Sequence, residues 1–392
     1  MNMLHTEVAI LGGGIEGCAV AYYTAKLGYQ VTVVERGELA CGTSSHCDGN
    51  ILVIDKEPGF DSQMTYQSQQ LIDQLAKTLP LDFEYRRPGS ILVCESEEEM
   101  SAAEQWVAGQ KKVGLPFRML DRSDLKNESI YLADDLPGGL ECASDSTVSP
   151  YRLAYALFAG AEQYGARLMT FTTVKAMTYS HKQYTIETDR GMLNADYVVN
   201  CAGVWAPAIG SMLDLSIPIK PRKGYILVAS RQLPVSPRKV MEFGYLMSKF
   251  GKSRHVAEDI KKYGVALVFE PTKSQNFLLG SSREFVGFDA KINWNVVRAI
   301  AQRCIRFYPK IANMNMLRVY CGFRPWTKDH FPIISPVKRY PGYFIAAGHE
   351  GDGIGLSAIT GKTIAEMIAG RPTTIETKKL SFDRFAKEGV GR

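Results

Sequence analysis

Small and apolar residues dominate the start of the chain, and glycines divide them into segments. Glu7 to Leu11 alternates into a short apolar run that stops at three glycines, and residues 15–27 are small and apolar, as in a helix pressed against a sheet. Gly28 ends that segment, and residues 29–35 form a second apolar run of the kind that buried parallel strands show. This pattern predicts a strand, a helix and a second, parallel strand, joined by a right-handed crossover.

The pattern of apolar and polar residues changes twice further along the chain. Before residue 215 we expect helices at 61–79, 97–113 and 151–164, and strands near 90–93, 167–171, 184–188 and 196–203. Between about 216 and 334 we expect β-rich runs at 225–228, 265–269 and 276–279, with one helix at about 293–308. The alternation of strands and helices seen before residue 215 then returns, with a strand expected at 343–347 and a helix at 357–369. We predict an α/β domain in three segments (1–85, 145–215 and 335–392) with a mainly antiparallel β (α+β) domain inserted in two (86–144 and 216–334).

Composition excludes several classes of protein. The 392 residues are 45% hydrophobic and 22% charged, which is typical of a globular protein with two structural units. Lys and Arg are scattered and the net charge is only +5, so we expect no nucleic-acid partner. We expect no transmembrane span and no secretory signal, because apolar stretches are short and glycines interrupt the first one. Eight cysteines without a C-x-x-C pair indicate reduced thiols in the cytoplasm and no metal site.

Three glycines lie between the first strand and the first helix, in the pattern G-x-G-x-x-G. Gly12 permits a tight turn, Gly14 lets the backbone approach a pyrophosphate, and Gly17 lets helix and strand pack closely. Glu35, at the end of the next strand, can accept hydrogen bonds from a ribose and disfavours the 2′-phosphate of NADP. The combination predicts a dinucleotide site; the alternative is a tight turn with a structural Glu35.

Three further segments resemble flavoproteins of the D-amino-acid oxidase superfamily, over nearly the whole chain. Residues 42–45 are similar to the loop that runs along the FAD pyrophosphate and ribityl chain, and residues 196–205 resemble the superfamily's "ADxVVxAAGxW" strand. Residues 348–361 resemble its C-terminal "GHxxxGxxLxPxTG" loop, whose N–H groups lie at the pyrimidine edge of the flavin. The resemblance implies FAD rather than NAD, with the three-segment domain as a Rossmann-like FAD-binding domain and the inserted one as the substrate-binding domain.

The glycine motif and the resemblance together assign a set of residues to the cofactor. They are Gly12, Gly14, Ile15, Glu16, Gly17, Glu35, Arg36, Gly42, Thr43, Ser44, Ser45, His46, Val174, Cys201, Ala202, Gly203, Trp205, Gly322, Arg324, Gly348, His349, Gly351, Asp352, Gly353, Ile354 and Gly355.

Within the superfamily, residues 277–288 and the Gly-His-Glu loop at 348–350 resemble the FAD subunits of heteromeric enzymes. These are opine (octopine/nopaline) oxidases, D-hydroxyproline dehydrogenases, dye-linked proline dehydrogenases and hydrogen cyanide synthase. The resemblance implies oxidation of the C–N bond of an amino or imino acid by hydride transfer to flavin N5. Partner subunits with an iron–sulfur cluster or a second flavin would accept the electrons, and could hold a cytoplasmic enzyme at the periphery of the membrane. Three alternatives stay open: a stand-alone glycine/sarcosine-type oxidase using O₂, a flavoprotein that oxidises 2-hydroxy acids or glycerol phosphate, and a non-catalytic FAD-binding subunit.

Two residues are candidates for catalysis, Arg324 and His349. Arg324 lies in a Gly-Phe-Arg-Pro element, and in glycine oxidase-like proteins the Arg of this element holds the substrate carboxylate in a bidentate contact. It could instead clamp the two domains in an ion pair. His349 could tune the flavin or a bound water, or could stabilise its loop. Arg283 is a weaker second candidate, better explained as structural, and Tyr245 could line the pocket.

Two departures from the relatives concern the flavin and the substrate. Some sarcosine-oxidase relatives attach FAD through a cysteine in a segment comparable to that of Cys321, but this residue is displaced by one position, and a buried free thiol is the simpler interpretation. Gly351 stands where glycine oxidase-like proteins often carry a second Arg, which favours a bulkier substrate.

Overall fold

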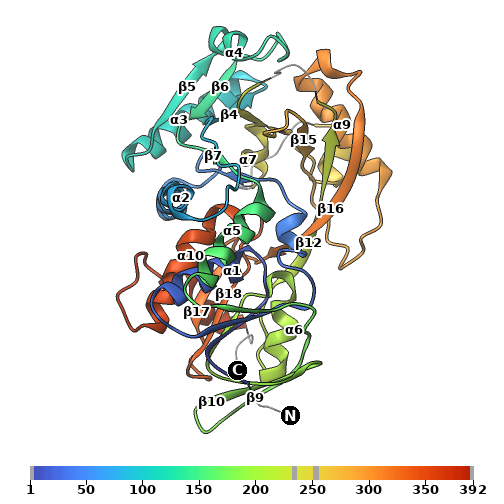
Figure 1. The fold of residues 1–392 in the computed structure, drawn as a ribbon. Coiled ribbons are helices and arrows are strands. Elements are labelled where there is room, and N and C mark those ends of the chain that lie inside the picture. Colours follow the sequence, from blue (N-terminus) through green and yellow to red (C-terminus); the bar gives the residue numbers. More distant parts are fainter. Residues whose placement is uncertain (1–3, 232–235, 250–255, 389–392) are drawn as a thin grey trace.

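Two eight-stranded sheets form the framework of the protein (Figure 1). The structure is a computed structural model that describes residues 4–231, 236–249 and 256–388. Strands of the first sheet come from residues 4–34, 167–200 and 333–347, and those of the second from 90–142 and 220–326. The predicted mixed α/β fold class is confirmed, whereas the domain boundaries stay a prediction. No helix within the described ranges has the length and apolar character needed to cross a membrane.

The first sheet is mainly parallel at its centre. Its order is β17 (Ile333–Pro336), β18 (Tyr343–Ala347), β11 (Gly191–Asn200), β1 (Leu4–Leu11), β2 (Val31–Val34) and β8 (Arg167–Met169). In addition, β10 (Gln183–Thr188) pairs with β11, and β9 (Val174–Ser180) pairs with β10. β1 pairs in parallel with both β2 and β11, and β11 with β18. All four residues of β2 are buried, as expected for a strand with both faces covered. The carboxyl ends of β1 and β2 therefore lie together beside the glycine turn.

Helices cover this sheet at close range. They are α1 (Ile15–Lys26), α2 (Phe60–Thr78), α5 (Pro150–Glu162) and α10 (Gly353–Ile368). A Cβ at Gly361 would lie 2.5 Å from the carbonyl carbon of Ala19, and one at Gly160 would lie 2.9 Å from the ring of Tyr22. Glycine thus lets α10 and α5 approach α1 closely, and this packing fixes the start of α1, which carries the glycine motif.

The second sheet is antiparallel except where β13 meets β4. Its order is β16 (Met316–Trp326), β12 (Lys220–Ala229), β15 (Phe277–Gly280), β14 (Val268–Pro271), β13 (Lys239–Glu242), β4 (Ser90–Cys94), β6 (Gly138–Cys142) and β5 (Phe117–Asp121). The other elements are β3 (Asn50–Ile51), β7 (Ser146–Thr147), α3 (Glu97–Lys112), α4 (Arg122–Glu128), α6 (Ala206–Gly210), α7 (Gly244–Lys249), α8 (Glu258–Lys262) and α9 (Trp294–Phe307).

Several elements differ from the expectation, among them the last helix and β9. The last helix was expected at 357–369 but runs from Gly353 to Ile368, so the glycines at 353 and 355 belong to its first turn. β9 was not expected, and of its residues only Met177 is buried. Polar residues interrupt its apolar ones, so the segment gives no continuous apolar run to detect.

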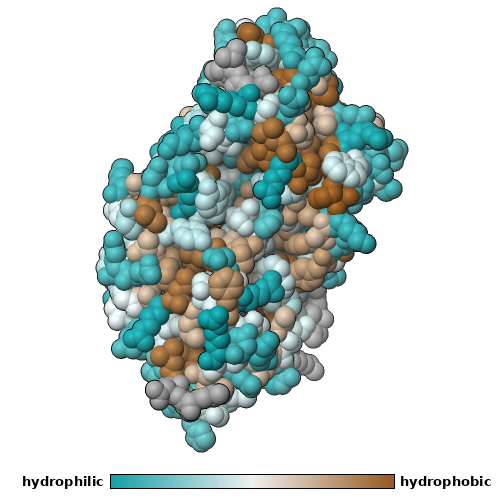
Figure 2. Space-filling view, turned by 45° about the vertical axis from the view of Figure 1, so that its right-hand side comes forward, coloured by the Kyte–Doolittle hydropathy of each residue, from teal (hydrophilic) through white to brown (hydrophobic). Residues whose placement is uncertain are grey.

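Several large apolar side chains remain exposed near the edge strand β16. Figure 2, in which the side carrying α9 and β16 is turned forward, shows apolar residues gathered in its upper half. We call this set the apolar patch; its members are Phe285, Val286, Phe288, Trp294, Met316 and Leu317. Trp294 and Leu317 are 67% and 62% exposed, which is unusual for side chains of this size.

Candidate active site

A cavity of about 420 Å³ is lined by residues of both sheets and of the helices between them. All residues assigned to FAD from the sequence line it except Gly17, Ser45 and Gly348. A Cβ at Gly17 would overlap the carbonyl oxygen of Gly12, which agrees with the packing role predicted for it. Ser45 donates a hydrogen bond to Gly42 O (3.3 Å) and is exposed, and Gly348 adopts φ +85° beside Thr327. These three residues shape the wall without facing the cavity.

The glycine turn is fixed at the start of α1. Gly12 has φ +113°, and a Cβ there would lie 2.6 Å from the carbonyl oxygen of Cys201. Glu35 accepts hydrogen bonds from Gly13 N (2.7 Å) and Gly37 N (2.9 Å), and Ile15 N donates to Ser44 Oγ (3.0 Å). These contacts fix the glycine turn at the N-terminus of α1, which lines the cavity, and a helix N-terminus is the position that a phosphate site requires.

Glycines also keep the cavity wall clear of side chains, as an FAD site requires. Gly203 has φ +54° and no atom within 4 Å of the position of a Cβ, so that any side chain there would project into open space. Arg36 stacks over Trp205, 4.0 Å from the ring centroid, beside the end of β2. A groove that these glycines keep free of side chains therefore joins the carboxyl end of β2 to Arg324, and an extended dinucleotide fits such a groove.

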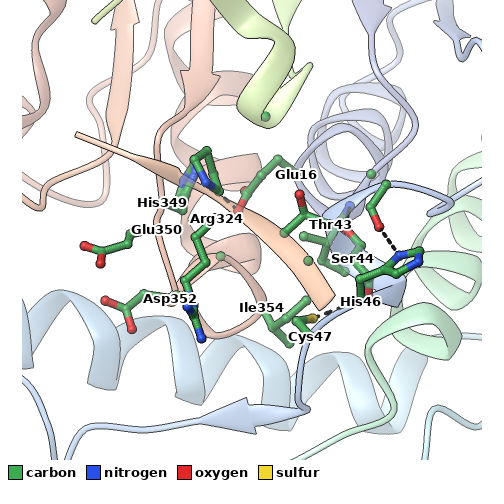
Figure 3. Close-up of a pocket in the computed structure, with 18 of the residues that line it drawn as sticks. Glu16, Thr43, Ser44, His46, Cys47, Arg324, His349, Glu350, Asp352 and Ile354 are labelled. Carbon is green, nitrogen blue, oxygen red and sulfur yellow. Dashed lines mark hydrogen bonds and ion pairs between the residues drawn. The ribbon is translucent and has the colours of Figure 1, made fainter. Parts of the chain in front are cut away.

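His349 lies beside Glu16 (Figure 3), and the two form a buried cluster with Thr360. Its Nε2 is 3.0 Å from Thr360 Oγ1, and its Nδ1 is 3.5 Å from Glu16 Oε1. Burial lowers the pKa of His349 to about 3 and raises the pKa of the Glu16 carboxyl well above its usual range. The His349 ring is therefore neutral near pH 7, burial favours the protonated form of the Glu16 carboxyl, and the contacts of the two residues join the loop before α10 to α1. This arrangement suits the loop-stabilising alternative better than a proton-transfer role.

Arg324 extends into the cavity from β16 (Figure 3). Its Nη1 donates to Ser282 O (2.9 Å), and it forms no ion pair with any carboxylate of the described ranges. The domain-clamping ion pair is therefore absent from this part of the chain. Burial lowers the pKa of Arg324, opposed by the charges of Asp48, Cys47 and Asp352. A buried guanidinium with free donors is well suited to bind a carboxylate.

Three ion pairs in the cavity wall, formed by two cations, were not expected from the sequence. Lys56 is almost fully buried and pairs with Asp55 and, at 2.8 Å, with Asp352. Arg222 pairs with Glu350. The only signal for Lys56 was a charged residue directly after a buried apolar run, and its partner Asp352 lies almost three hundred positions away.

Cys321 does not line the cavity. Its Sγ is 3.5 Å from Ala290 O, whereas Gly322 and Arg324 on the same strand do line the cavity. Successive side chains of a strand point to opposite faces, so the thiol faces away from the proposed flavin position. This geometry does not support a covalent link through Cys321. Cys41 and Cys47 line the cavity, and burial raises the pKa of each thiol.

Comparisons with known proteins agree with this site. The sequence profile of the DAO family, FAD dependent oxidoreductase, matches residues 7–367. The chain is 27% identical to glycine oxidase from Geobacillus kaustophilus (98% of each chain) and 27% identical to hydrogen cyanide synthase subunit HcnC from Pseudomonas aeruginosa (97% of each). The crystal structure of L-proline dehydrogenase from P. horikoshii superposes with a TM-score of 0.88 at 22% identity over all of both chains, which shows a shared fold. The chain therefore belongs to the DAO family of FAD-dependent oxidoreductases.

Proposed function

We propose that this enzyme oxidises the C–N bond of an amino or imino acid, and that its substrates are secondary amines such as opines, D-hydroxyproline or proline-like acids. The observation that carries the proposal is Arg324: a buried guanidinium with no carboxylate partner among the described residues, in the cavity that the glycine turn also lines. In such a position the guanidinium fork can hold a substrate carboxylate and so fix the α-carbon.

FAD supplies the hydride acceptor when it is bound. The N-terminus of α1 at Gly14 would hold its pyrophosphate, Glu35 its ribose, and the start of α10 at Gly353 the flavin edge. Arg324 binds the carboxylate of a substrate whose amine is neutral. The α-carbon then loses hydride with its electron pair, nitrogen loses a proton, and a C=N bond forms. Water adds to this carbon and releases the nitrogen, which yields a 2-oxo acid and an amine.

No side chain has to act as a nucleophile in this reaction. Burial keeps the Cys47 thiol protonated and the His349 ring neutral, so that neither competes for the substrate. Gly351 adds no side chain beside Arg324, where a Cβ would still be 3.8 Å away. This open position favours substrates larger than glycine.

We further propose that the chain is the catalytic subunit of a heteromeric dehydrogenase in the cytoplasm, where partner subunits carry electrons away through an iron–sulfur cluster or a second flavin. The relative HcnC is named as a subunit of hydrogen cyanide synthase, and the apolar patch offers a surface for such a partner. All eight cysteines are free thiols, which fits a reducing compartment.

Turnover with an artificial electron-accepting dye tests the proposed reaction. We expect the holoenzyme to reduce the dye with secondary-amine acids, to release a 2-oxo acid, and to show no turnover with the corresponding 2-hydroxy acids. Its reduced flavin should reoxidise slowly in air, as expected of a dehydrogenase. Turnover with hydroxy acids alone would refute amine oxidation, and fast reoxidation with formation of H₂O₂ would refute only the dehydrogenase assignment.

A further inference from the structure

Besides Arg36, five cationic side chains line the cavity, and two of them form ion pairs with carboxylates. They are Lys56, Arg222, Lys239, Arg283 and Arg324. Lys56 and Arg222 form the ion pairs described above. Lys239 lies near Glu270, whose pKa burial raises to about 7 while the charge of Lys239 opposes that rise. The remaining cations are Arg283 and Arg324.

Arg283 forms no ion pair with any carboxylate in the part of the chain that the structure describes. Its guanidinium lies 3.8 Å from the ring centroid of Tyr245, which itself lines the cavity. Burial and the neighbouring charges of Arg222 and Arg324 lower its pKa well below the usual range. A buried guanidinium near two others is stabilised when an anion binds. The structural role first considered for Arg283 does not account for its place on the cavity wall.

Strand register brings Arg283 and Arg324 to the two sides of a single glycine. The backbone of Lys223 forms an antiparallel β-bridge with that of Glu284, and Tyr225 N donates a hydrogen bond to Ser282 Oγ (3.2 Å). Between these two contacts, Arg283 lies opposite Gly224. On the other side of β12, Gly224 pairs with Gly322, and the guanidinium of Arg324 occupies the space that a Cβ at Gly224 would need. Ser282, whose carbonyl accepts from Arg324, also directly precedes Arg283 in the chain. The two free guanidiniums are therefore neighbours on one wall of the cavity.

We propose that Arg283 forms a second anion site, so that the substrate is a secondary amine with two carboxylates, one on each side of its nitrogen. Arg324 holds the carboxylate of the carbon that is oxidised, and Arg283 holds the carboxylate of the N-carboxyalkyl substituent. This inference rests on the proposed function, because it concerns the other end of the same substrate. A charge-assisted contact of this kind corresponds to roughly a tenfold to hundredfold preference over a substrate that lacks the second carboxylate.

Binding of unreactive analogues tests the anion site without turnover. Oxydiacetate carries two carboxylates, and methoxyacetate lacks one of them but is otherwise its match. We expect oxydiacetate to perturb the visible flavin spectrum of the holoenzyme with a Kd at least tenfold lower than that of methoxyacetate. In Arg283→Gln the two Kd values should become equal, whereas Arg231→Gln should keep the difference, because Arg231 is exposed, lies outside the cavity and donates a hydrogen bond to Gln275.

Anaerobic flavin reduction separates this inference from the proposed function. Iminodiacetate and sarcosine differ only by the second carboxylate, and we expect a kcat/KM at least tenfold higher for iminodiacetate. Arg283→Gln should remove this preference, whereas Arg231→Gln should keep it. Equal values for the two substrates in the native enzyme, or a preference that survives Arg283→Gln, would overturn the second site. If neither amine reduces the flavin, the proposed function fails for these substrates, and the two Kd values alone decide whether the anion site exists.

Discussion

Replacing Arg324 with alanine is expected to lower kcat/KM for the amino or imino acid substrate by about 1000-fold. Two charge-assisted hydrogen bonds to the carboxylate together contribute about 4 kcal/mol, and their loss also frees the α-carbon to move. The flavin should remain bound, because the glycine turn and α10 are unaffected. Steady-state kinetics with a dye acceptor, together with the flavin content of the purified variant, measure both effects.

Arg324→Lys is the matched control for this variant. Lysine keeps the positive charge but lacks the planar fork, so we expect it to recover only part of the lost kcat/KM, roughly tenfold over alanine. If Arg324→Ala kept both its flavin and the native kcat/KM, that result would contradict the assignment of Arg324 to the substrate. If the native chain and the variant were both inactive, the result would favour the alternative of a non-catalytic FAD-binding subunit.

Replacing Gly12 with alanine is expected to yield protein without bound FAD. The residue has φ +113°, and the new Cβ would lie 2.6 Å from the carbonyl oxygen of Cys201, so that either the turn or the end of β11 has to move. Movement of the turn would withdraw the N–H groups at the start of α1 from the pyrophosphate. The 450 nm absorbance of the purified variant and its titration with FAD provide the measurement, and we expect at least a hundredfold weaker binding.

Gly28→Ala controls for the cost of backbone strain alone. Gly28 has φ +95° and no atom within 4 Å of a Cβ, so alanine there meets the same kind of strain without a clash. We expect it to lose about 1 kcal/mol of stability and to retain its flavin. Equal flavin content in the two variants would show that the turn at Gly12 does not hold the cofactor.

The dinucleotide-binding half of the site could be predicted because it is encoded locally. Gly12, Gly14 and Gly17 lie within six positions, and each glycine is required by a backbone approach that the structure shows or that a phosphate needs. The strand ending at Glu35 and the strand preceding Gly203 were recognised in the same way, from short apolar runs that end at a polar or glycine residue.

The substrate half was less predictable because its residues meet only through the second sheet. Arg283 becomes a neighbour of Arg324 only through the pairing of β15, β12 and β16, and no spacing along the chain encodes that register. The buried position of Lys56 is likewise understood only from its ion pair with Asp352, which folding brings beside it. Glycines at 353 and 355 resembled a loop, although they form the first turn of α10.

C–N oxidation is tested most directly by the rate of anaerobic flavin reduction by a secondary-amine acid that carries deuterium on the carbon beside its carboxylate. We expect bleaching at 450 nm without O₂, slowed several-fold by the deuterium, because this C–H bond breaks as the flavin is reduced. Flavin that stays oxidised with every amino and imino acid tested, while a 2-hydroxy acid bleaches it, would contradict the assignment of Arg324 and its cavity to C–N oxidation.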